Sequence, residues 1–175
     1  MHIVSGLKDF ELTRAEYNNA VELHSGRLYG YVLKCLHDSE DARDIVQDSF
    51  ERLWNHRKSV EFEKSKSWLF TTAHNALINF VKKKSRMDLY DENVPERVVM
   101  IQNNFEMKEI VDLVTETLPQ IQKSILLLRD LEGYNYKEIS DLLNISDAQV
   151  KVYLFRARRK IKDNLTQFAK FNEIA

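Results

Sequence analysis

The sequence has little of what disulfide-bonded, turn-rich or membrane-spanning proteins need. Its 175 residues include one cysteine, two prolines and four glycines. The single cysteine, Cys35, excludes an internal disulfide bond and a cysteine zinc cluster, and the scarcity of glycine and proline disfavours a β-rich fold with many tight turns. No apolar run approaches the roughly 20 residues of a membrane span, and the N-terminus lacks a signal-peptide pattern. We therefore expect a soluble, cytoplasmic and mainly helical protein.

An excess of one charge is also lacking, because 26 basic and 27 acidic residues give a net charge of -1. The distribution along the chain is uneven. Residues 61–86 hold six basic and two acidic side chains, and residues 146–162 hold six and one, whereas residues 87–118 between them hold two and eight. A phosphate backbone responds to local clusters because the Debye length is only about 8 Å at physiological salt. Basic runs at helix C-termini can also serve only to stabilise the helix dipole. Two separate basic segments favour a nucleic-acid partner over that explanation.

Apolar spacing predicts helices in the first half of the chain. One begins at a capping box of Thr13 and Glu16 and continues to about residue 36, with a break or a close helix contact at Ser25 and Gly26. The next follows a cap at residue 38 or 39. Side chains at spacings of three and four give it one polar face, formed by Asp44, Gln47, Asp48 and Glu51.

A charged stretch without a regular period, residues 56–66, is expected to be a loop, and a long helix follows over about residues 67–86. Asn75 lies on the polar side of that helix, which ends in the basic cluster of Lys82, Lys83, Lys84 and Arg86. Residues 87–105 are acidic and aperiodic and predict a linker. The helical period returns at Phe105, and Pro119 opens a further helix that Gly133 closes. The sequence therefore predicts an all-α protein whose helical domains, 1–86 and 106–175, are joined by a flexible linker, 87–105.

The sharpest local pattern is a helix-turn-helix. Residues 136–143 form a short amphipathic helix, residues 144–146 a turn, and Ser146 with Gln149 a second capping box that opens another helix. Val150, Leu154 and Ala157 lie on the inner side of that last helix. A recognition helix presents its outer N-terminal face to base edges while flanking cations contact phosphates. The outer residues are Gln149, Lys151, Val152, Phe155, Arg156 and Arg159, with Arg158, Lys160 and Lys162 beside them.

Two blocks of this sequence resemble bacterial RNA polymerase sigma factors of the extracytoplasmic-function (ECF) group. The first is residues 41–54, DARDIVQDSFERLW, followed by residues 67–75, SWLFTTAHN. The second is residues 133–140, GYNYKEIS, followed by Val150-Lys151 and by residues 155–158, FRAR. The blocks stand in the family's order. The resemblance implies a sigma region 2 bundle in the first domain and a region 4 helix-turn-helix in the second.

The resemblance implies a promoter-specificity subunit of core RNA polymerase that is not an enzyme and has no cofactor, metal or small-molecule substrate. The first domain would bind the polymerase and open the minus-ten element of promoter DNA, and the second would read the minus-thirty-five element. The polar face of residues 44–51 would dock on the beta-prime clamp helices, as a rigid helix offering acceptors to a partner coiled coil. Asn75 would lie beside a flipped minus-ten base, in a pocket completed by loop 56–66. Phosphates of the promoter DNA would be contacted by Lys82, Lys83, Lys84 and Arg86. Trp68 is expected to be a core anchor rather than a stacking platform.

In the second domain, Lys151, Val152, Phe155 and Arg156 match the family's minus-thirty-five readers. Val152 and Tyr153 depart from the family, which often has serine and arginine there. Valine can contact a thymine methyl but cannot hydrogen-bond, so the preferred sequence would differ. Arg156 is the best candidate for a bidentate guanine contact. The family also implies an anti-sigma partner, often membrane-bound, although no residue here indicates one.

Two other classes of protein fit the sequence less well. A conventional helix-turn-helix regulator would bind duplex DNA without joining the polymerase, but residues 1–100 lack the short β-branched strands of a receiver domain. An enzyme is disfavoured because the five histidines are scattered without metal-ligand spacing, and neither a glycine-rich phosphate loop nor a nucleophile elbow is present.

Overall fold

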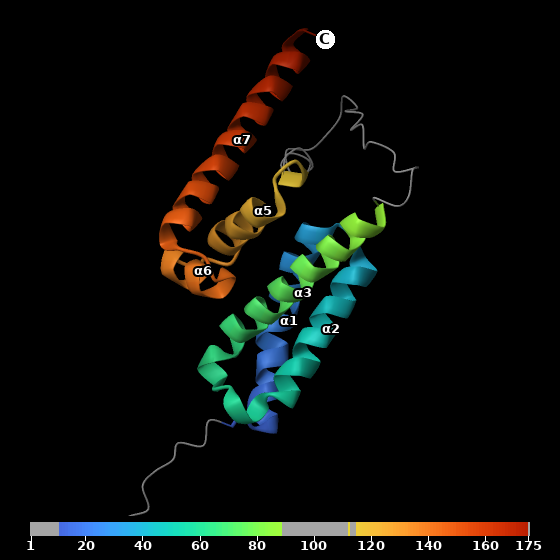
Figure 1. Ribbon diagram of the computed structural model, residues 1–175, viewed down its shortest axis with the longest axis vertical. Coiled ribbons are helices and arrows are strands. Elements are labelled where there is room, and N and C mark those ends of the chain that lie inside the picture. Colours follow the sequence, from blue (N-terminus) through green and yellow to red (C-terminus); the bar gives the residue numbers. More distant parts are fainter. Residues whose placement is uncertain (1–10, 89–111, 113–114, 175) are drawn as a thin grey trace, which may run out of the picture. The chain divides into compact units, whose positions relative to one another are not determined.

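The computed structural model describes residues 11–88, 112 and 115–174. Within those residues every regular element is a helix and no strand is present, which confirms the all-α prediction. The chain divides into two compact units, Met1–Ile78 and Asn79–Ala175. Figure 1 shows α1, α2 and α3 in blue to green and α5, α6 and α7 in yellow to red. The predicted linker and the helix expected from Phe105 lie almost entirely outside the described residues.

The first unit contains α1 (Arg14–Leu36), α2 (Ser39–Asn55) and the part of α3 (Ser65–Asp88) that ends at Ile78. The predicted capping box opens α1, because the Thr13 hydroxyl accepts from the Glu16 N–H while the Glu16 carboxylate accepts from the Thr13 N–H. Asp38 is the cap of α2 and accepts from two backbone N–H groups. Of the break or close helix contact expected at Ser25 and Gly26, neither is found: α1 continues through both residues, and a Cβ added at Gly26 would meet nothing within 4 Å.

The core of this unit forms where the apolar sides of the three helices meet. Tyr31 of α1 and Phe70 of α3 are fully buried, with ring centroids 5.5 Å apart. The aromatic contact joins α1 to α3, while α1 also packs along α2. Residues that are no more than 5 % exposed include Ala20, Leu28, Val32, Cys35, Ala42, Leu53, Leu69, Ala73 and Leu77.

The loop predicted over residues 56–66 is wrong in part. Two short 3-10 turns, Arg57–Ser59 and Phe62–Lys64, occupy it, and α3 begins at Ser65. Val60 lies buried between the turns. A charged sequence can form these turns because a single turn needs only a few local hydrogen bonds and no amphipathic period. One such bond runs from the Lys64 N–H to the Glu61 carbonyl at 3.0 Å.

The second unit contains α5 (Gln120–Leu126), a π-helical turn η3 (Leu127–Leu131), α6 (Tyr136–Leu143) and α7 (Asp147–Ile174). α7 packs against both α5 and α6. Pro119 precedes α5, and Gly133 has the positive φ of 77° expected of a helix-ending glycine. The π turn was not predicted. The buried residues Ile125, Leu128, Ile139, Val150, Leu154 and Ala157 form the core.

Candidate nucleic-acid interface

The connection between α6 and α7 is fixed by its own hydrogen bonds. Asn144 ends α6 in the left-handed conformation, with φ 53°. The Ser140 hydroxyl then donates to the Ile145 carbonyl at 2.6 Å, and the Ile145 N–H donates to the Ser140 carbonyl. α6 itself begins with a capping box of Asn135 and Glu138 that was not predicted from the sequence. The start of α7 is therefore held in one orientation relative to α6.

The second capping box is confirmed and affects one of the predicted DNA contacts. The Gln149 side-chain oxygen accepts from the Ser146 N–H at 2.9 Å, and the Gln149 N–H donates to the Ser146 hydroxyl. Gln149 is exposed, but its amide oxygen already serves the start of α7. A base contact through that oxygen would have to compete with the Ser146 N–H that donates to it.

The two sides of α7 have opposite chemistry, as the sequence predicted. Val150, Leu154 and Ala157 are buried. The opposite side exposes Lys151, Val152, Phe155, Arg156 and Arg159. Val152 is 44 % exposed and Phe155 is 66 % exposed, which is unusual for large apolar side chains in a basic surface. Apolar groups between cations match a groove that presents thymine methyls between phosphates.

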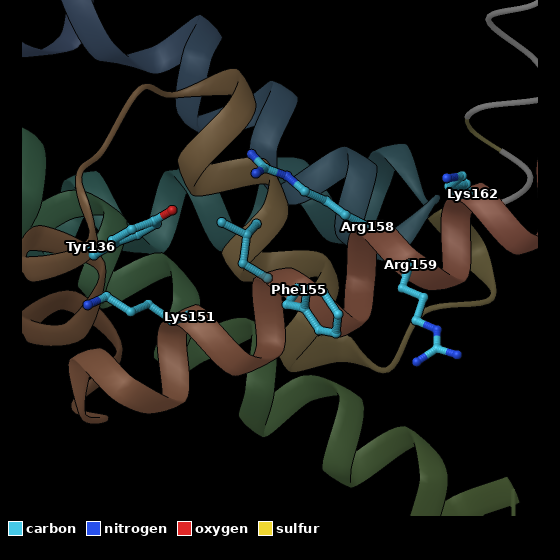
Figure 2. A pocket seen from close by; sticks show the side chains of 7 residues that line it. Tyr136, Lys151, Phe155, Arg158, Arg159 and Lys162 are labelled. Carbon is cyan, nitrogen blue, oxygen red and sulfur yellow. The ribbon is translucent and has the colours of Figure 1, made fainter.

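A hollow of about 490 Å³ lies where α6 meets this face of α7 (Figure 2). Tyr136 forms its α6 side, and its ring lies 5.9 Å from the Lys151 ammonium and 5.1 Å from the Arg129 guanidinium. Both cations are within the range of a cation–π contact, so Tyr136 helps to hold Lys151 at the edge of the exposed face. The hollow is completed by Leu154, Phe155, Arg158, Arg159 and Lys162.

Three further cations on α7 make ion pairs or hydrogen bonds within the unit. Arg158 pairs with Asp130 at 2.7 Å and Lys160 donates to the Thr117 carbonyl at 2.7 Å, so both link α7 to segments far away in sequence. Arg159 lies 3.8 Å from Asp163 within α7. Sequence spacing shows the i,i+4 pair but not the two long-range contacts. Exposed ion pairs such as those of Arg158 and Arg159 contribute little to stability.

The predicted minus-ten residues lie on α3. Asn75 is exposed, and so are Lys82, Lys83, Lys84 and Arg86. Asn75 and Lys82 are seven residues apart, which places them on the same side of the helix about 10 Å apart along its axis. The structure therefore presents an amide and a cation cluster on one helical element.

Directly beside Asn75, His74 is buried and is 4 % exposed. Its Nδ1 lies 2.9 Å from the Tyr31 hydroxyl. Burial lowers the pKa of His74 to about 4, so the imidazole is neutral at pH 7. The burial of His74 was not predicted, although this residue lies in the apolar stripe with Phe70 and Leu77. The His74–Tyr31 contact joins α3 to α1 and turns Asn75 outward.

Trp68 occupies an intermediate position rather than the fully buried one expected of a core anchor. Its ring centroid lies 5.8 Å from that of His56, an exposed residue at the end of α2. The π face of Trp68 is therefore partly covered by a neighbouring ring.

The polar face of α2 is exposed as predicted. Asp44, Gln47 and Glu51 are exposed, while Asp48 is half-buried and pairs with Arg52 at 2.8 Å. Arg52 was not included in the predicted face, although the i,i+4 spacing would have indicated the pair. The face thus combines carboxylates, an amide and one intramolecular ion pair.

A helix-turn-helix with a basic outer face, following three helices that carry an exposed amide and a cation cluster, is typical of a helical DNA-binding protein. Sequence comparison agrees. Residues 20–87 match the family model of Sigma-70 region 2, and residues 108–161 match that of Sigma-70, region 4. The chain is similar to the ECF RNA polymerase sigma factor SigM of Bacillus subtilis, with 33% identity over 146 residues that cover 81% of this chain and 90% of SigM.

The ECF RNA polymerase sigma-E factor of Haemophilus influenzae is 27% identical over 90% of this chain and 88% of its own length. The chain therefore belongs to the ECF family of RNA polymerase sigma factors. Its function is promoter-specific transcription initiation with core RNA polymerase, and the comparisons favour this over a conventional helix-turn-helix regulator.

Two solved structures share the fold. The sigma factor RpoE of Bartonella quintana, in complex with the anti-sigma factor NepR, has a TM-score of 0.74 at 21% identity and covers 86% of this chain and 97% of RpoE. CnrH, in complex with the cytosolic domain of CnrY, has a TM-score of 0.67 at 18% identity and covers 89% of this chain and 90% of CnrH. In the described part of the present chain, none of the helices is both long and apolar enough to cross a membrane.

Proposed function

We propose that the two halves of the chain divide the work of a sigma factor. Residues 1–86 bind core polymerase through the α2 face and open the minus-ten element through Asn75 and the cations of α3. Residues 106–175 read the minus-thirty-five element through α7, and residues 87–105 connect them. The observation that carries this proposal is the outer face of α7, where Lys151, Val152, Phe155 and Arg156 are exposed on a helix that is fixed from behind.

Run-off transcription with core polymerase on a genomic library tests the proposal as a whole. Transcripts should begin at a set of sites that share an upstream and a minus-ten motif, and only when the chain is added. If the chain binds duplex DNA tightly by itself and directs no start site, the proposed roles are wrong.

We further propose that an anti-sigma partner controls this chain. Support comes from the two solved structures of the same fold, of which RpoE is bound to the anti-sigma factor NepR and CnrH to the cytosolic domain of CnrY. The partner would cover the polymerase-binding or DNA-binding faces. The chain acts by binding, catalyses no reaction and works in the cytoplasm, where polymerase and promoter are found.

Docking through α2 can be tested with two carboxylates of its polar face. The double substitution Asp44→Ala and Asp48→Ala should slow association with core polymerase by about tenfold at low salt, because such charges steer and orient a partner. The double substitution Glu22→Ala and Glu63→Ala removes two exposed carboxylates that lie outside this face, and it is the control for the loss of two negative charges. Stopped-flow anisotropy of the labelled chain measures both. Equal slowing by the two pairs would show only an effect of net charge.

The cation cluster at the end of α3 predicts a change in salt dependence. The double substitution Lys84→Glu and Arg86→Glu should weaken promoter binding by the holoenzyme and lower the slope of log affinity against log salt by about 2, because two phosphate contacts no longer release counterions. Lys84→Arg with Arg86→Lys retains both charges and should leave the slope unchanged. An unchanged slope in the glutamate variant would place the phosphate contacts elsewhere.

A further inference from the structure

The three aromatic residues Tyr17, Phe50 and Trp54 form a hollow between α1 and α2, which we call the aromatic hollow. The Tyr17 ring lies edge-on to Trp54 at 5.0 Å and to Phe50 at 6.5 Å, between ring centroids. The space has a volume of about 570 Å³ and opens to solvent, and its other lining residues are Arg14, Asn18, Gln47 and Glu51. Aromatic walls around an open space are a common anchor site at protein interfaces.

The aromatic walls are held in place before any partner arrives. The Tyr17 hydroxyl donates to the Phe50 carbonyl at 3.2 Å, and Arg57 lies 4.4 Å from the Trp54 ring while also donating to the Trp54 carbonyl. Tyr17 and Trp54 are half-buried. Little side-chain entropy remains to be lost on binding, which favours tight anchoring.

The position of the hollow indicates what it binds. Gln47 and Glu51 line the hollow and also belong to the polar face of α2. A partner helix lying on that face therefore reaches the hollow without a gap. Charges on such a face set orientation and on-rate more than affinity, so a stable complex needs an apolar anchor close by.

The charges of the rim indicate the chemistry of the anchor. Arg14 and Glu51 carry opposite charges on the two sides of the opening, and Asn18 and Gln47 are neutral. Glu51 acts on Tyr17, whose phenol pKa is raised by burial first and by this carboxylate second. The rim thus favours neither sign of charge, while the walls are apolar.

We propose that the aromatic hollow receives an apolar side chain, the size of leucine or methionine, from the polymerase helix that docks on α2. This interaction surface rests on the proposed function, because it requires that α2 is the polymerase-binding helix. The hollow supplies apolar contact and the polar face supplies orientation.

Blocking the hollow from its rim tests the proposal without removing any core contact. Asn18→Phe places a ring in the opening. Asn19→Phe places the same ring on the next residue, which is also exposed but does not line the hollow. Affinity of the full chain for core polymerase of the source bacterium is measured by anisotropy, with circular dichroism confirming equal helicity. We expect Asn18→Phe to weaken binding about tenfold or more and Asn19→Phe to leave it within about twofold. Equal effects at the two positions would overturn the proposal.

Charge at the same position tests the chemistry of the anchor. Asn18→Asp and Asn18→Lys should both weaken binding, because each puts a charge beside an apolar group. Asn19→Asp and Asn19→Lys measure the general effect of charge on α1. If one sign at position 18 strengthens binding while the other weakens it, the occupant is charged and the proposal is wrong.

The double variant of Asp44 and Asp48, which lies outside the hollow, separates this proposal from the one on which it rests. If that variant weakens binding and Asn18→Phe does not, α2 is the docking helix and the hollow is empty in the complex. If neither variant weakens binding, α2 is not the docking helix, and the proposal that the hollow holds an anchor side chain is wrong as well.

Discussion

Replacing Arg156 with alanine should reduce the discrimination between the best upstream element and its point variants by roughly tenfold to a hundredfold. A bidentate contact between arginine and guanine contributes about 1–3 kcal/mol of discrimination. Arg156 is exposed on the outer face of α7, two turns into the helix, where base edges are within reach of a recognition helix. The loss should be confined to one base pair, at which the variant accepts all four bases almost equally.

Holoenzyme binding to a library randomised over the upstream element measures this effect. Lys162→Ala is the matched control, because Lys162 is an exposed cation of the same helix nearly two turns further on. We expect the control to weaken binding to all sequences by a similar factor. If Arg156→Ala also weakens every sequence alike, Arg156 contacts a phosphate and reads no base.

Acid should destabilise the first unit through His74, by about 3 kcal/mol between pH 6.5 and pH 4. The imidazole titrates near 6.5 when unfolded but near 4 when folded, because burial disfavours its charged form. Between those values the unfolded state binds more protons, so protons favour unfolding. The contribution of His74 is fully present above pH 6.5, is lost as the pH falls to about 4, and then changes no further. One pKa unit corresponds to about 1.4 kcal/mol, which gives the size of the effect.

Urea titrations followed by tryptophan fluorescence report the unfolding of the first unit. The sequence has two tryptophans, Trp54 and Trp68, and both lie in Met1–Ile78. Carboxylates titrate in the same range. The pKa of His24 is also lowered, by burial first and by Lys66 second. The test therefore compares how the free energy of unfolding changes with pH in the native chain and in two variants. His74→Gln should lack the additional loss of stability between pH 6.5 and pH 4, whereas His56→Gln should retain it. Parallel curves for all three proteins would show that His74 does not titrate with unfolding.

Local chemistry accounts for the parts of the fold that were predicted correctly. Thr13 and Glu16, like Ser146 and Gln149, are close in sequence and make the expected caps. The buried stripe of α7 follows from the helical period alone. These features depend on neighbours within four residues, which a single sequence displays directly.

Features that depend on distant contacts or single turns were missed. The contacts of Arg158 with Asp130 and of Lys160 with Thr117 join residues 28 and 43 positions apart, so spacing gives no indication of them. The π turn at Leu127–Leu131 keeps an apolar pattern that resembles an ordinary helix. The helical spacing could have predicted the burial of His74, because this residue continues the buried stripe of Phe70 and Leu77. It was missed because histidine is a polar residue type.

The aromatic hollow was missed for a related reason. Tyr17 lies on α1, whereas Phe50 and Trp54 lie on α2, and only the packing of these helices brings the three rings together. The polar face beside it was visible because its members lie on one helix. The sequence thus indicated the polar face of the proposed polymerase interface but not the hollow beside it.

The two-sided construction of α7 has a consequence for how promoter preferences diverge. Val150, Leu154 and Ala157 secure the helix from behind, so Val152 and Arg156 in front can vary with little loss of stability, since exposed substitutions usually change it by less than about 0.5 kcal/mol. A duplicated copy of such a gene could therefore acquire a new set of target genes through one or two substitutions while remaining folded throughout.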